Sequence, residues 1–283
     1  MSYDDKIEFT KENIDSYLKA VAKEYRKAIG KGMPAEMILI GGASVLLNYG
    51  FRNMTTDIDA MIRAASTMKD AINKVGDIYN LPNGWLNDDF KRTESYSPQI
   101  VLYSEYYKTF SNVLTIRTVS AEYLIAMKLK SGRLYKNDIS DIMGILMEHK
   151  RKGNPISIEQ IKKAAENLYG SWDKIPKNSR QIITESIDNG DFEGLYNEYR
   201  SEEIAKRQGL IRFEHDYPGV VTEANVDEIL NKIGSMRNRD NHGGEKESLM
   251  SRLRENQEIV MRREKAIKKN PRDVQKKRDE TSL

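Results

Sequence analysis

The sequence predicts an α+β fold, with a small mixed β-sheet flanked by helices and a mostly helical C-terminal region. Three observations lead to this prediction. Short apolar runs alternate with segments of helical period through the first half of the chain. Glycine and proline separate these segments. Beyond residue 156 the apolar runs give way to polar segments with helical spacing.

The N-terminal elements follow from apolar spacing and from their end signals. An amphipathic helix is expected over residues 10–30, with Thr10 as its N-cap and glycines at its end. A strand is expected at 36–40, a helix at 43–49 and a second strand at 56–62. The two strands would lie on either side of a glycine-initiated helix.

The rest of the first half continues this alternation. We expect a helix at 66–79, strands at 100–103 and 113–117, and helices at 121–129 and 138–150. The helix at 121–129 is almost wholly apolar, which predicts that it is buried.

The second half of the chain is polar and helical. Three helices are expected, at residues 157–169, 178–189 and 192–208. The segment from 246 onward is charged, and between Arg252 and Arg278 it carries eleven Lys or Arg against four acids. Four parts are therefore predicted: an N-terminal helix packed on the core (1–34), the core (35–153), a helical C-terminal domain (154–237), and a linker with a charged helical or disordered tail (238–283).

The amino-acid composition limits which metals and which covalent cross-links the protein can contain. The 283 residues include no cysteine, which excludes disulfides and thiolate metal sites and favours Mg²⁺ or Mn²⁺ bound by oxygen. The three histidines lie far apart in sequence, without the spacing of a metal site. No apolar stretch reaches the length of a membrane span and no signal peptide is recognisable, so we expect a cytoplasmic protein without membrane contact.

A glycine turn follows the first predicted strand. Gly41 and Gly42 allow the backbone to approach a ligand without a Cβ in the way. Ser44 adds a hydroxyl at the start of the following helix, whose free N–H groups and dipole favour an anion. This combination is suited to binding a triphosphate.

Two carboxylates lie thirteen residues further on. Asp57 and Asp59 are separated by one residue, so on a strand they would point to the same side. Together they could hold one or two Mg²⁺ ions, which neutralise charge on a phosphoryl group as it is transferred. Either motif alone is common, but the two occur with Arg52 and Thr56 in one strand–helix–strand unit, and the combination is far more specific.

These residues resemble a known family. The pattern Gly41-Gly42-x-Ser44 followed by Arg52-x-x-x-Thr56-Asp57-x-Asp59 is similar to the signature of the DNA polymerase β-like nucleotidyltransferase superfamily. The resemblance is greatest to the minimal nucleotidyltransferases of prokaryotes and to AbiEii-type toxins. Further similar elements are Met127-Lys128-Leu129, Gly132-Arg133, Asp138-x-x-Asp141 and Trp85-Leu86-Asn87-Asp88.

The resemblance implies a role for each matching residue. Gly42 and Ser44, with Gly41, Arg52 and Thr56 beside them, would bind the nucleoside triphosphate, and Asp57 and Asp59 the metal. Lys128 would neutralise phosphate charge or assist proton transfer. Asp138 or Asp141 would act as an additional acid or as an orienting partner, and Arg133 would pair with one of them.

One expected residue is missing from the pattern. Members of the superfamily often carry a third carboxylate on a later strand, which serves as base for the attacking hydroxyl. The predicted strands at 100–103 and 113–117 contain no acid, which leaves Glu105, just past the first of them, and Asp138 as candidates.

The predicted activity is the Mg²⁺-dependent transfer of a nucleoside monophosphate from an NTP to an acceptor hydroxyl. By resemblance the acceptor is RNA, tRNA in particular, or a protein, and the context is a toxin–antitoxin or phage-defence system with a cognate antitoxin. Two alternatives stay open. The first is a catalytically degenerate NTP-binding subunit whose basic tail docks on nucleic acid, and the second is nucleotidylation of a small molecule such as an aminoglycoside.

Overall fold

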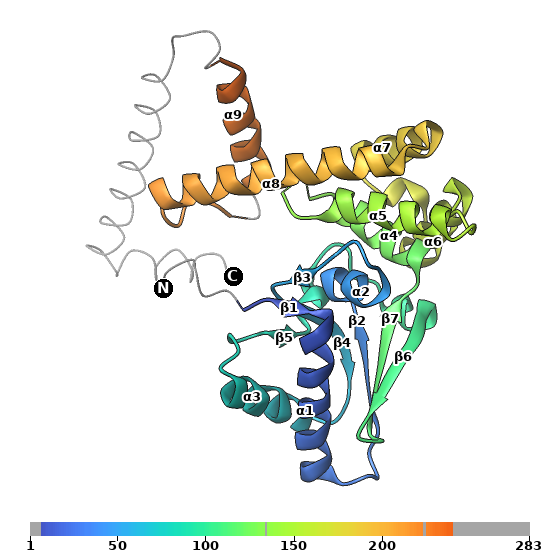
Figure 1. Cartoon of the computed structure of the whole chain (residues 1–283), viewed down its shortest axis with the longest axis vertical. Helices are drawn as coiled ribbons and strands as arrows, with labels where there is room; N and C mark the ends of the chain where they lie inside the picture. Colours follow the sequence, from blue (N-terminus) through green and yellow to red (C-terminus); the bar gives the residue numbers. More distant parts are fainter. Residues whose placement is uncertain (1–6, 134, 223–224, 240–283) are drawn as a thin grey trace, which may run out of the picture. The chain divides into compact units, whose positions relative to one another are not determined.

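A computed structural model describes residues 7–133, 135–222 and 225–239 of the chain (Figure 1). It divides into two compact units, Met1–Arg212 and Phe213–Leu283. The first unit holds a mixed sheet and a set of packed helices, so the predicted α+β class with a mostly helical C-terminal region is confirmed.

The main sheet has five strands in the order β5-β4-β2-β7-β6. Its members are β2 (Ala35–Leu39), β4 (Ile58–Arg63), β5 (Leu86–Asn87), β6 (Ser104–Phe110) and β7 (Leu114–Val119). The central strand β2 pairs antiparallel with β4 and parallel with β7, while β5 runs parallel to β4 and β6 antiparallel to β7. A separate two-stranded ribbon joins β1 (Phe9–Thr10) to β3 (Met54–Thr55).

Residue alternation along β2 places apolar side chains on both faces of the sheet. Met37 and Leu39 belong to one core with residues of α1 (Lys11–Ile29) and α3 (Thr67–Tyr79). Ile38, and Ile40 just past the strand, belong to a second core with residues of α4 (Ala121–Ser131) and α5 (Asp138–Arg151). A strand covered on both faces reads as a continuous apolar run, as this one does.

Five helices follow the sheet in the first unit (Figure 1). They are α4 (Ala121–Ser131), α5 (Asp138–Arg151), α6 (Ile158–Tyr169), α7 (Lys177–Asn189) and α8 (Phe192–Asp216), the last of which runs on into the second unit. Their ends carry ordinary capping signals; Ser157 and Gln160, for example, form a reciprocal capping box on α6. The predicted burial of the apolar helix α4 is confirmed.

One predicted strand is wrong. Residues 100–103 lie in a 3-10 helix, Pro98–Tyr103, and the strand β6 begins only at Ser104. The Ser97 hydroxyl accepts the Gln99 N–H and proline occupies the first helical position, which together start a helical turn where apolar residues alone suggested a strand. The strand expected at 56–62 begins at Ile58, so Asp57 precedes it.

The second unit is described through α9 (Val226–Arg239). In it Glu214 accepts the backbone N–H groups of Gly219 and Val221, and this contact closes the turn after α8. The predicted charged tail lies outside the described residues, and the four predicted parts of the chain stay a prediction. Within the described residues no helix is long and apolar enough to cross a membrane.

Candidate active site

The glycine turn joins β2 to the helix α2 (Gly41–Asn48). Gly41 has φ +56°, a left-handed conformation that favours glycine. A Cβ on Gly42 would lie 2.7 Å from the Nη2 atom of Arg52 and from the Oγ1 atom of Thr55, so other side chains pack directly on this backbone. The first N–H groups of α2 have no partner within the helix, which gives the turn a positive end.

Ser44 is fully buried behind this turn. Its Oγ atom accepts the backbone N–H of Val119 at 3.1 Å, which ties α2 to the end of β7. The structure therefore gives this hydroxyl a positioning contact within the protein. Its predicted contact with a triphosphate stays a prediction.

Asp57 and Asp59 lie beside the turn. Asp57 is exposed in the bend before β4, and Asp59 is half-buried as the second residue of that strand. Register pairing places Asn87 of β5 next to Asp59, to which it donates a side-chain hydrogen bond. Burial, and next the Asp57 charge, raise the pKa of Asp59, although Lys136, Arg133 and Asn87 act in the opposite direction.

The threonine that supports this pair is Thr55. Its buried hydroxyl donates to the backbone carbonyl of Asp57 at 3.2 Å, fixing the bend. Thr56, the residue predicted from the motif, is exposed, and its predicted contact with the nucleotide stays a prediction.

Lys128 holds together a second, buried group of charges. Its Nζ atom lies 3.0 Å from Asp138 Oδ1 and 2.9 Å from Asp141 Oδ2. Arg52 pairs with Asp141, and Arg133 Nε lies 3.0 Å from Asp138 Oδ2. We call these five residues the buried ion network.

The pKa shifts of Asp138 and Lys128 favour the charged form of each side chain. Burial alone would raise the pKa of Asp138, but Lys128, Arg133 and the Ser131 hydroxyl bring it well below its usual value. Burial alone would lower the pKa of Lys128, but Asp141 and Asp138 raise it above its usual value. Asp138 is therefore a weak base and Lys128 a weak acid near neutral pH, which disfavours proton transfer by either.

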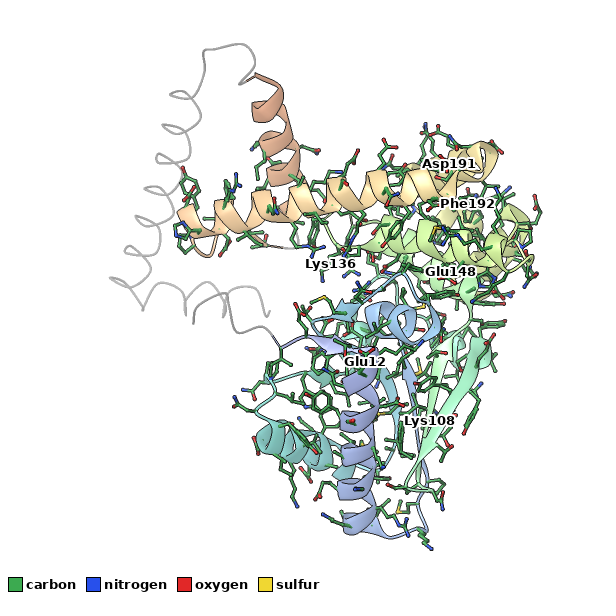
Figure 2. The ribbon with its side chains drawn as sticks, in the orientation of Figure 1. Glu12, Lys108, Lys136, Glu148, Asp191 and Phe192 are labelled. Atoms are coloured by element: carbon green, nitrogen blue, oxygen red, sulfur yellow. The ribbon has the colours of Figure 1, made fainter. Side chains whose placement is uncertain are left out.

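Arg133 and Lys136 connect the two sets of residues. Both lower the pKa of Asp59 by their charge, while Arg133 also pairs with Asp138. Lys136 lies in the segment between α4 and α5 (Figure 2). The structure thus brings the glycine turn, Asp57 and Asp59 together with the buried ion network through Arg52 on one side and Arg133 on the other.

A family model described as nucleotidyltransferase of unknown function (DUF6036) matches residues 16–178, more than half of the chain. The chain belongs to this family. The matched residues include the glycine turn, Asp57, Asp59 and the buried ion network. The comparisons with curated proteins and with solved structures found no match.

The chain carries a carboxylate pair that fits a divalent cation. Among the described residues Asp57 and Asp59 form no ion pair, and their mutual repulsion is of the kind that a bound cation relieves. Among the same residues no group of three or more His, Asp or Glu is arranged to hold a metal. Two carboxylates with phosphate and water oxygens are an ordinary set of ligands for Mg²⁺.

The described part of the chain places no third carboxylate beside this pair. Glu105 lies on β6 and is separated from β4 by β2 and β7, roughly 14 Å away at the usual spacing of strands. Both carboxylate oxygens of Asp138 are already paired with Lys128 and Arg133 in the buried ion network. Neither candidate is suited to act as the base for the attacking hydroxyl.

Sequence reasoning missed Glu203, on α8. This buried side chain accepts the N–H groups of Ile139 and Ser140, at 3.0 and 3.2 Å, and the Ser140 hydroxyl. It caps the first turn of α5, from which Asp138 and Asp141 project. Burial raises the pKa of Glu203 to about 7, although its hydrogen bonds act in the opposite direction. Nothing in a single sequence distinguishes this residue from the exposed acids of the same helix.

Proposed function

We propose that the protein transfers a nucleoside monophosphate from an NTP to an acceptor hydroxyl, with release of pyrophosphate, in a reaction that depends on a divalent cation. The observation that carries the proposal is that the start of an anion-binding helix lies beside two carboxylates that form no ion pair among the described residues. Membership of a nucleotidyltransferase family supports the class of reaction.

Each part of the site has a role in this proposal. The N–H groups at Gly41 and Gly42 bind the phosphates, and Ser44 holds α2 in place through its bond to Val119. Asp57 and Asp59 hold Mg²⁺ or Mn²⁺, which supplies charge neutralisation on the transferred phosphoryl group. Thr55 fixes the bend that presents Asp57.

The buried ion network positions Arg52 rather than moving protons. Lys128 and Arg52 share the Asp141 carboxylate, so the guanidinium of Arg52 is held against the backbone of Gly42. A fixed positive charge at this point neutralises phosphate charge in both the ground state and the transition state. Catalysis of phosphoryl transfer consists largely of such positioning and electrostatics.

The acceptor is proposed from the motif resemblance to be RNA, tRNA in particular, or a protein, with the chain acting as the toxin of a toxin–antitoxin or phage-defence system. Purified protein, Mg²⁺ and each α-labelled NTP in turn, with total RNA and total protein, should give a labelled product. Asp57→Ala/Asp59→Ala should abolish the label. Labelling that the double variant leaves unchanged would overturn the assignment.

A second candidate function rests on the missing base. Among the described residues no third acid accompanies Asp57 and Asp59, which favours an NTP-binding subunit without transfer activity. Pyrophosphate release separates the two candidates. Metal-dependent NTP binding without pyrophosphate release on any RNA or protein fraction would select the binding subunit.

A further inference from the structure

One face of α8 lies against the candidate site. Tyr196, Arg200, Glu203 and Arg207 are spaced by four, three and four residues, so they share one side of the helix. This stretch of α8 belongs to the first compact unit but lies outside the residues matched by the family model. We call this side the α8 site face.

Three hydrogen-bonding side chains fix the α8 site face. The Tyr196 hydroxyl donates to the backbone carbonyl of Phe51 at 3.2 Å, next to Arg52. Glu203 caps the first turn of α5, and Arg207 donates to the side-chain oxygen of Asn137, the residue that precedes α5. The face therefore borders both segments that supply the Arg52–Asp141 pair.

Arg200 lies between these fixed points on the same side of the helix. Among the described residues neither Arg200 nor Arg207 forms an ion pair, and the hydrogen bond from Arg207 goes to a neutral amide. Burial lowers the pKa of Arg207, and the charges of Arg200 and Arg52 lower it further, although Glu203 and Asp141 act in the opposite direction. The three guanidiniums are therefore near enough for their charges to influence one another.

The nearby acids do not balance this charge. Asp141 already binds both Lys128 and Arg52. Glu203 is engaged by the N–H groups of α5, and with a pKa of about 7 it is only partly ionised at neutral pH. Arg200 and Arg207 thus lie beside the site without an ion pair among the described residues, on a helix face that hydrogen bonds join to Phe51 and to the start of α5.

We propose that Arg200 and Arg207, with Arg52, form a second phosphate-binding site, separate from the N–H groups of α2. A planar guanidinium donates two parallel hydrogen bonds to a phosphate, and several of them together are typical of phosphate recognition. The proposal rests on the proposed function, because the phosphate belongs to one of its substrates. It is either a terminal phosphate of the NTP or a backbone phosphate of an RNA acceptor.

The test compares Arg200→Gln/Arg207→Gln with wild type and with Lys162→Gln/Lys163→Gln, which removes two positive charges from α6. Two titrations separate the sources of the phosphate: NTP with Mg²⁺ by calorimetry, and a fluorescent single-stranded RNA oligonucleotide at several salt concentrations. Thermal unfolding of each variant checks that the fold is kept. Arg52, which the site also uses, is left unchanged.

Removal of two charged hydrogen-bond donors should weaken binding by at least about tenfold for the ligand whose phosphate occupies the site. If that ligand is RNA, the slope of log affinity against log salt should also become shallower, by about 0.7 for each phosphate that the variant no longer neutralises. The α6 variant should bind like wild type.

Affinities for both ligands equal to those of wild type would overturn the second phosphate site and leave the proposed function standing. An equal weakening in the α6 variant would also overturn it, because the effect would then be one of net charge. A wild-type protein that binds neither ligand would overturn the proposed function itself, and the second site with it.

Discussion

The molecule contains two pairs of aspartates that look alike in sequence and differ in their surroundings. Asp57 and Asp59 lie at the start of β4, exposed and half-buried respectively, without an ion pair among the described residues. Asp138 and Asp141 project from the first turn of α5 and are buried among Lys128, Arg52 and Arg133. Burial and the charge of Asp57 raise the pKa of Asp59, whereas the side chains of Lys128 and Arg133 lower the pKa of Asp138.

This difference in surroundings indicates that the two pairs have different roles. Carboxylates without cationic partners are available to a metal and its bound nucleotide. Carboxylates saturated by lysine and arginine cannot take up a metal without releasing those partners, and instead fix the positions of cationic side chains. Substitutions at the two pairs, and at Glu203 and Gly42 beside them, should separate these roles.

Asp57→Asn/Asp59→Asn should lower the transfer rate by at least about a thousandfold, because the charge neutralisation supplied by a bound cation is worth several kcal/mol. The free energy of unfolding should stay the same or rise, since the substitution removes repulsion between partly solvated acids. Pyrophosphate release and urea denaturation measure the two effects. A large decrease in the free energy of unfolding would instead show that Asp57 and Asp59 stabilise the fold, which would contradict their assignment to a metal.

Asp138→Asn should lower the free energy of unfolding by about 3–5 kcal/mol, because it leaves Lys128 and Arg133 buried with less countercharge. Urea denaturation gives the value. The matched control is Asp173→Asn, which removes the ion pair between Asp173 and Arg180. Because the Asp173 side chain is 81% exposed, this substitution should lower the free energy of unfolding by less than about 1 kcal/mol. Equal losses of unfolding free energy in the two variants would contradict the conclusion that Asp138 belongs to a buried ion network.

The Glu203 side chain should make stability fall as pH rises. A carboxyl group whose pKa goes from 4.5 in the unfolded chain to about 7 in the folded protein binds protons more tightly when folded. Its contribution is therefore fully present below pH 4.5 and is lost as pH rises through 7. Between pH 5 and pH 8, wild type should lose roughly 2–3 kcal/mol relative to Glu203→Gln. Parallel pH profiles of the two proteins in denaturation experiments would contradict this.

Gly42→Ala should cost about 1–3 kcal/mol, because the new Cβ would lie 2.7 Å from Arg52 and Thr55 and would push Arg52 away from Asp141. Gly32→Ala is the control, since nothing lies within 4 Å of a Cβ built there. Thermal unfolding compares them. A neutral Gly42→Ala would show that Arg52 is not held tightly against the turn.

Much of this architecture is predictable from the sequence where the signal is local. Apolar spacing predicts the N-terminal helix and the buried helix α4. Glycine predicts the turn, because Gly41 adopts a left-handed backbone conformation there. The strand expected at 100–103 failed because a proline and a serine cap outweighed an apolar run. The motif also singled out Thr56, whereas the buried hydroxyl that fixes the bend belongs to Thr55.

The parts that escaped prediction depend on contacts between distant segments. Arg52 meets Asp141 across 89 positions, and Glu203 meets Ser140 across 63. Lys128 lies on an apolar helix whose sequence does not show that Asp138 and Asp141 pack against its ammonium group. Sequence spacing places carboxylates on a face, but it does not reveal which cations pack against them.

The most direct test of the division between the two pairs is the effect of Mg²⁺ on NTP affinity, measured by calorimetry. Asp57→Asn/Asp59→Asn is compared with wild type and with Asp70→Asn/Asp77→Asn, two exposed acids of α3. Mg²⁺ should tighten binding at least about tenfold in wild type and in the control. In the first variant the Mg²⁺ effect should vanish while metal-free affinity is kept. An unchanged Mg²⁺ effect in that variant would contradict the account.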